Sequence, residues 1–113
     1  MHNKPTFFLQ IMKIEEKLQL QSTESPIVYL HWEQIGWKAY NQSAWYFNQR
    51  YPTYSPLHDT TFDNVSFVYI SIPDEYLKSV LEGKSYAHIE NDLIAVDCTI
   101  PFDEEKYKEW LQQ

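Results

Sequence analysis

Glycine is scarce in this chain, which has only 2 glycines in 113 residues. A loop that cradles a phosphate brings several backbone N–H groups close to the anion, and that close approach depends on residues without a Cβ atom. The sequence has almost no material for such a loop. We therefore expect neither a nucleotide-dependent enzyme nor a bound cofactor.

Cysteine and long apolar runs are also lacking. Cys98 is the only cysteine, so an internal disulfide is excluded and the composition fits a reducing compartment. No apolar run approaches the roughly 20 residues that span a bilayer, and the N-terminus lacks the basic start and apolar stretch of an export signal. The expected location is the cytoplasm, without a membrane partner.

Positive charge is in short supply, because 9 Lys and Arg residues stand against 16 Asp and Glu residues, for a net charge of -7. The summed field repels phosphate backbones, so a nucleic acid would need a local basic patch. By contrast, 4 tryptophans and 9 tyrosines exceed what a small core hides. Exposed aromatic surface favours protein partners, so a protein partner is expected and nucleic acid is disfavoured. The partner's identity and the oligomeric state are left open.

The chain shows no repeat or linker, and residues 1–113 are expected to form a single domain. Its hydrophobic pattern predicts helices interleaved with strands, which is typical of an α/β or α+β fold with a mixed β-sheet flanked by helices. Helices are predicted over residues 5–21, 37–51, 74–82 and from 102 onward. Strands are predicted over 26–32, 65–72, 85–89 and 93–99, with at most a short edge strand in the loop 51–64.

Catalytic and metal-binding patterns are weak. The four histidines, at positions 2, 31, 58 and 88, include no pair spaced for one helix face, so no metal site is expected. An enzyme built on Cys98, with His31 or His88 as its base, is one alternative, because a thiolate needs a base or a positive field. An inert, buried cysteine is the favoured interpretation, and we expect no catalytic residue.

The segment from 31 to 51 is the most unusual, since its aromatic residues alternate with amides and with the cations Lys38 and Arg50. Such a surface could stack nucleic-acid bases or grip a peptide. The alternative is that the aromatics form a core stripe at helical spacing, made of Trp37, Tyr40, Ala44 and Phe47. Tyr51 and Tyr54, in the proline-containing loop, are better candidates for exposed contacts.

Residues 27–99 resemble the N-terminal mismatch-recognition domain, domain I, of MutS-type DNA mismatch repair proteins, especially small stand-alone relatives without the ATPase. The strand IVYLHW leads through the turn EQIG into WKAYNQSAW. It is followed in the family's order by VSFVYISIP, DEYLKSVLEG and the strands that end in LIAVDC. The resemblance implies the layered fold and a binding function.

The differences from that family fall on its functional residues. Gly36 stands where the family has a phenylalanine that stacks on the mispaired base, Lys38 replaces the following glutamate, and Trp37 keeps the aromatic between them. Since glycine cannot wedge a base step open, the expectation is a non-catalytic binding module whose mismatch reading is lost or altered. The alternative is a nucleic-acid-binding protein in which Trp37 stacks while Lys38 and Arg50 contact phosphate. The candidate binding residues are Gly36, Trp37, Lys38, Arg50, Tyr51 and Tyr54.

Overall fold

The computed structural model describes residues 12–20 and 26–113, and the rest of the helix predicted over 5–21 lies outside that part of the chain. Helix α2, Ile14–Gln19, falls within the predicted range. A side chain satisfies the free N–H at the start of this helix: the backbone N–H of Lys13 donates to the carboxylate of Glu16 at 2.8 Å. An acid three residues into a helix stabilises the first turn in this way.

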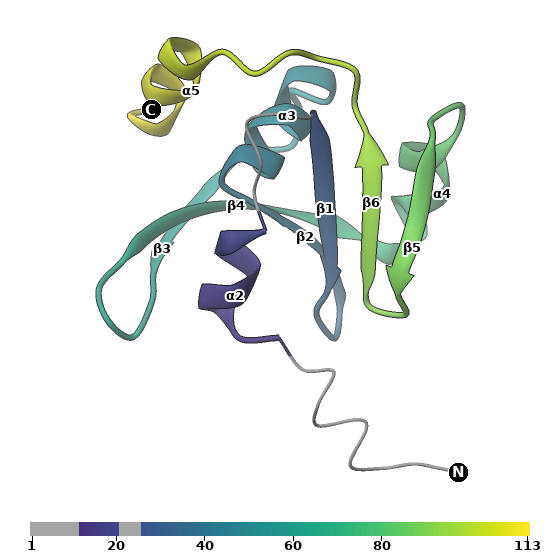
Figure 1. The fold of residues 1–113 in the computed structure, drawn as a ribbon, viewed down its shortest axis with the longest axis horizontal. Helices are drawn as coiled ribbons and strands as arrows, with labels where there is room; N and C mark the ends of the chain where they lie inside the picture. Colours follow the sequence, from purple (N-terminus) through teal and green to yellow (C-terminus); the bar gives the residue numbers. More distant parts are fainter. Residues whose placement is uncertain (1–11, 21–25) are drawn as a thin grey trace, which may run out of the picture.

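One six-stranded sheet organises the described residues, in the order β3-β4-β2-β1-β6-β5 (Figure 1). The helix-and-strand class predicted from the sequence is confirmed, but every pairing is antiparallel, which differs from the mixed sheet that was expected. Three of the five pairings, β1–β2, β3–β4 and β5–β6, are hairpins, and a short turn can only join antiparallel strands. The strands are β1 Ile27–Trp32, β2 Gly36–Tyr40, β3 Leu57–Thr60, β4 Ser66–Pro73, β5 Tyr86–Glu90 and β6 Leu93–Asp97.

The single helix predicted over 37–51 is wrong in its first part, which is strand β2, and right from α3, Gln42–Arg50, onward. The chain changes direction at Asn41, whose φ of 47° is outside the helical region. Asn41 is fixed there because its N–H donates to the carbonyl of Val68 at 2.9 Å and its Oδ1 accepts from the N–H of Val68 at 3.0 Å. Pairing with two neighbouring strands therefore overrides the helical spacing of the aromatics.

The main core lies on one face of the sheet, under α3, which packs on β1, β2 and β4. Trp37, Ala44 and Phe47 belong to it, as the stripe predicts. Tyr40 does not, because successive residues of a strand point to opposite faces. The other large buried side chains of this core are Leu30, Trp45, Tyr46, Ile70, Ile72, Ile94 and Trp110.

Two further predicted helices are confirmed. The first is a 3₁₀ turn, Asp74–Tyr76, that continues into α4, Leu77–Leu81, and the chain leaves it through Gly83 at a φ of 75°. The second is α5, Glu104–Leu111, whose start is capped by Asp103. Within the described ranges, no helix is both long enough and apolar enough to cross a membrane.

The opposite face of the sheet carries a polar cluster beneath α2. Lys17 of α2 donates to Glu33 at 2.6 Å, and Glu33 also accepts the hydroxyl of Tyr40 and lies 3.4 Å from the ammonium of Lys38. Burial acts to raise the pKa of Glu33, but the hydrogen bonds from Lys17 and Tyr40 and the two lysine charges outweigh it, so this pKa is lowered. The cluster ties α2 to the β1–β2 turn.

His31 lies in the same cluster and is only 2% exposed. Its ring meets Tyr40 edge to face at 5.7 Å, and no group among the described residues pairs with its Nε2. Burial, reinforced by the charge of Lys17 and opposed by that of Glu33, lowers the pKa of His31 from 6.5 to about 4. The imidazole is therefore neutral at pH 7.

Candidate functional site

The residues predicted to form a binding site fall into two separate places. Gly36, Trp37 and Lys38 lie in β2, where the register with β4 directs Trp37 into the core and Lys38 to the opposite face. Arg50, Tyr51 and Tyr54 lie at the C-terminal end of α3 and just after it. The structure therefore divides the predicted set, and only the second group shares a surface.

Trp37 has little exposed surface, with 6% of the residue accessible. Its Nε1 donates to Asp74 at 3.0 Å, and its ring contacts Trp32 at 5.4 Å between centroids. The charge of Lys38 is also engaged, by Glu33 and by the ring of Tyr69, which lies 4.8 Å away. A base cannot stack on Trp37 in this fold, and the pair does not present the surface that the nucleic-acid alternative requires.

Gly36 is held by close packing of the sheet. It pairs with Pro73, and a Cβ atom at this position would lie 2.9 Å from the carbonyl oxygen of Ile72. That distance is shorter than real Cβ contacts, and the neighbouring atom is backbone, which moves little. Glycine is needed here for space, and no side chain can project from this position.

Alanine at position 36 is expected to lower the free energy of unfolding by about 1–3 kcal/mol, because β2 and β4 must separate to make room. Gly83→Ala is the control for a site with open space: its Cβ meets nothing within 4 Å, and only the φ of 75° opposes it, at a cost of about 1–2 kcal/mol for a left-handed alanine. Urea denaturation of both variants measures the difference. Equal stability of Gly36→Ala and the unmodified protein would show that the contact is absent.

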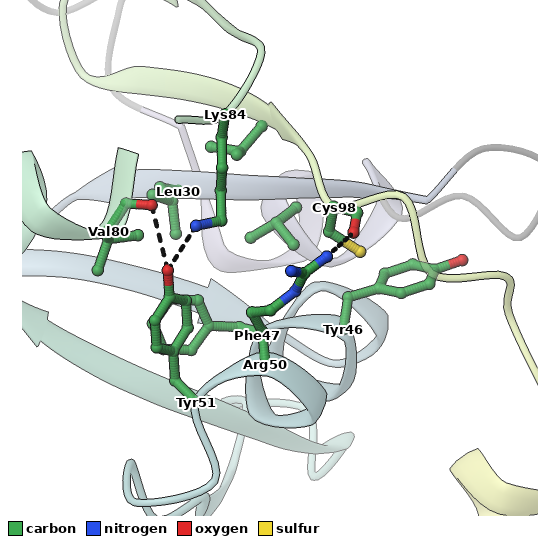
Figure 2. Close-up of a pocket in the computed structure, with 10 residues that line it drawn as sticks. Leu30, Tyr46, Phe47, Arg50, Tyr51, Val80, Lys84 and Cys98 are labelled. Atoms are coloured by element: carbon green, nitrogen blue, oxygen red, sulfur yellow. Dashed lines mark hydrogen bonds between the residues drawn. The ribbon is translucent and has the colours of Figure 1, made fainter. Parts of the chain in front are cut away.

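The described residues form a pocket on the α3 side of the sheet, between α3, α4 and strands β1 and β6 (Figure 2). The space in it that admits a water-sized sphere is about 20 Å³, and its lining is almost entirely apolar. This is well below the roughly 300–1,000 Å³ of a pocket for a drug-sized ligand, so the pocket is a small recess that admits only a small group. The lining residues are Val28, Leu30, Tyr46, Phe47, Arg50, Tyr51, Val80, Lys84, Val96 and Cys98.

Two cations reach this pocket from opposite sides, Lys84 from the turn before β5 and Arg50 from the end of α3 (Figure 2). Lys84 donates to the hydroxyl of Tyr51 at 2.6 Å and lies 5.1 Å from the centre of that ring. Arg50 donates from Nη2 to the carbonyl of Cys98 at 3.0 Å. No carboxylate of the described residues forms a salt bridge with either cation. Their positive charge is thus uncompensated at close range in an acidic protein.

Tyr51 and Tyr54 are partly buried, which corrects the prediction that they are exposed contacts. Their rings pack on Phe47 at 4.8 and 5.3 Å, respectively, and Tyr51 donates its hydroxyl to the carbonyl of Val80 at 3.4 Å. Tyr54 is further fixed because its carbonyl accepts from Asn48 at 2.9 Å. Tyr51 forms a wall of the pocket, while Tyr54 supports it from behind.

Arg50 also fixes the chain that follows β6. Besides the carbonyl of Cys98, its Nη2 bonds Oγ1 of Thr99 at 3.1 Å. Thr99 has a φ of 60°, a rare conformation for a β-branched residue. Such strain persists only where several contacts hold it. The Nη2 group of Arg50 therefore holds the chain after β6 in place. The other N–H groups of the guanidinium remain available to a ligand.

Cys98 does not present a reactive thiolate. The residue is 5% exposed. Burial is the largest influence and raises the pKa of the thiol; the charge of Asp97 acts in the same direction, and the Ile100 hydrogen bond and Arg50 only partly oppose them. His31 points to the opposite face of the sheet. His88 pairs with Ile94, four residues before Cys98, so neither histidine that the enzyme alternative names lies beside the thiol. Within the described part of the chain, no group of three or more His, Cys, Asp or Glu side chains could hold a metal ion.

Sequence patterns did not identify Lys84 or the apolar side chains that form the floor of the pocket, Val28, Leu30, Val80 and Val96. Lys84 stands one residue after the glycine that ends the α4 region, a common position for a solvated lysine, and nothing in its spacing indicates a contact with α3. The exposed aromatic surface predicted from the composition is present elsewhere, in Trp32, Phe62, Tyr76 and Tyr86, which are 37%, 98%, 50% and 48% exposed. These four lie on different segments and do not line the pocket.

Comparison of the chain with protein-family models, with curated proteins and with solved structures finds no match.

Proposed function

We propose that the protein is a non-catalytic binding module that holds an acidic group of a protein partner in the pocket between α3 and α4. The observation that carries this proposal is the convergence of Arg50 and Lys84 on one apolar pocket without a carboxylate partner. Two cations beside an apolar lining attract a carboxylate strongly, because charge-assisted hydrogen bonds strengthen where water is excluded.

A protein partner fits the size and charge of the molecule better than a nucleic acid. The net charge of -7 repels a polyanion along its whole length, whereas a single carboxylate needs only a local positive site. The pocket is also too small for a nucleotide to enter. The nucleic-acid alternative would rest on Arg50 alone, because Trp37 is buried and Lys38 lies on the other face.

Kinship with the MutS mismatch-recognition domain is kept as part of this proposal, with its base-reading function lost. It rests on the order of the segments in residues 27–99. In such a relative, the position of the stacking phenylalanine is Gly36, where the carbonyl of Ile72 leaves no room for any side chain. Binding would then have moved from the β1–β2 turn to the end of α3.

Titration with two hexapeptides tests the proposed function by ¹⁵N–¹H NMR: one with a glutamate in the middle and both ends capped, and one with a free carboxylate at a C-terminal valine. At least one should shift the signals of Arg50, Tyr51 and Lys84. Lys84→Met should weaken that binding by about tenfold, since a charged hydrogen bond contributes about 1.5–3 kcal/mol.

Lys108→Met is the matched control, because it removes the same charge from an exposed side chain of α5 that pairs only with Glu104, at 3.2 Å. It should leave the affinity unchanged. If neither peptide shifts the pocket signals, the proposed function is wrong. If Lys108→Met weakens binding as much as Lys84→Met, the effect is one of net charge and the pocket is not the site.

A further inference from the structure

Resting on the proposed function, we infer that the acidic group is the C-terminal carboxylate of a partner chain whose last residue has a small branched aliphatic side chain. The pocket places positive charge at its opening and apolar atoms on its floor, within the reach of a single residue. A C-terminal valine or isoleucine carries both complements on adjacent atoms. Capture of chain ends by clustered donors is an established mode of peptide recognition.

The donors at the opening suit a carboxylate. The guanidinium has five N–H donors in a planar fork, and its bonds to Cys98 and Thr99 both use Nη2. The N–H groups of Nε and Nη1 remain to donate to carboxylate oxygens. Lys84 faces Arg50 across the pocket (Figure 2), and the ammonium keeps donors beyond its bond to Tyr51.

The apolar floor of the pocket favours a branched aliphatic side chain on the last residue of the partner. Val28, Leu30, Val80 and Val96 bring branched aliphatic groups together from three elements, with Phe47 beside them. The recess admits a water-sized sphere over only about 20 Å³, so the methyl groups of one small side chain can enter it but a long acyl chain cannot. Burial of each CH₂ group contributes about 0.8 kcal/mol, so a branched side chain here adds to the affinity.

An internal aspartate or glutamate matches this pocket less well. Its carboxylate ends a polar side chain, so no apolar group from the same residue can reach the floor while the oxygens meet Arg50 and Lys84. An internal acid would therefore use the cations and leave the apolar floor in contact with water. A free small acid shares the terminal residue's chemistry but lacks the preceding residues, which add contacts outside the pocket.

Fluorescence anisotropy with labelled hexapeptides tests the inference. The peptide ending in valine with a free carboxylate should bind 10- to 100-fold more tightly than its C-terminal amide, because the amide loses the charge-assisted bonds. Replacing the last valine by glycine should cost about tenfold. N-acetylvaline, measured by competition, should bind more weakly than the hexapeptide. Lys84→Met should remove the preference for acid over amide, and Lys108→Met should keep it.

Arg50→Met is a second variant, used only if its thermal unfolding matches that of the unmodified protein, because Arg50 also holds Thr99. If a capped peptide with an internal glutamate binds as tightly as the free valine end, and still depends on Lys84, the proposed function stands and the chain-end inference is overturned. If N-acetylvaline binds as tightly as the hexapeptide, a free acid is the ligand and the chain-end inference is again overturned. If no probe binds, the proposed function fails as well.

Discussion

Trp110→Ala is expected to lower the free energy of unfolding by about 3–5 kcal/mol, the usual cost of removing a buried tryptophan ring. Trp110 is 7% exposed and belongs to the main core. Its ring stacks on Tyr107 at 6.3 Å, and its Nε1 donates to Oδ1 of Asn48 in α3 at 3.0 Å. The substitution therefore removes the buried residue of α5 and its hydrogen bond to α3. Urea denaturation followed by circular dichroism measures the loss.

Trp110→Phe separates packing from hydrogen bonding. It keeps an aromatic ring in the core and removes the indole N–H, leaving the Oδ1 of Asn48 without this donor, so a loss of about 1–2 kcal/mol is expected. Lys108→Met, on the exposed side of the same helix, should change stability by less than about 0.5 kcal/mol. A cost below about 1 kcal/mol for Trp110→Ala would show that α5 is not docked as described.

The free energy of unfolding should fall by about 2–3 kcal/mol as the pH is lowered from 6.5 to about 4, because of His31. Its pKa is lowered from 6.5 to about 4 in the folded protein. In this window the unfolded chain binds a proton that the folded protein does not, so stability increases with pH until the histidine is neutral in both states. At about 1.4 kcal/mol per pKa unit, the full change in pKa corresponds to about 3.5 kcal/mol, most of which is lost between pH 6.5 and about 4.

Substitution of His31 by leucine fills the buried site with a side chain that does not titrate. The dependence of stability on pH between about 4.5 and 6.5 should then become nearly flat, as measured by urea denaturation at a series of pH values. The contribution of Glu33 lies below this window, because the lowered pKa of its carboxyl makes its stabilisation persist until the pH falls below 4.5. His88→Gln, on the exposed strand β5, should retain the full pH dependence. The same slope in His31→Leu would contradict the burial of this imidazole.

Local patterns in the sequence predicted several elements correctly. Strand β1, strand β4, the α4 region and α5 lie where β-branched runs, Pro73, Gly83 and the acids of 103–105 place them. The hairpin of β5 and β6 was also predicted, because Asn91 and Asp92 suit a tight reversal. In each of these cases the signal and the structure involve residues close together in the chain.

Local sequence patterns did not predict strand β2 or the grouping of the candidate binding residues. The residues WKAY fit a helical stripe and a strand equally well, and their position between β1 and β4 decides between the two. The predicted set Gly36, Trp37 and Lys38 was assigned to one surface, but alternation along β2 separates Trp37 from Lys38. Of the predicted binding residues, Arg50 and Tyr51 reach the pocket.

The sequence by itself determined a chain poor in glycine and positive charge, rich in aromatics, and built of helices interleaved with strands. Only the tertiary structure decided that Lys84 and Arg50 line one pocket and that His31 lies on the other face of the sheet from Cys98. The reason is that composition and hydrophobic period depend on neighbours within a few residues, whereas strand register and the packing of α3 on the sheet join residues tens of positions apart.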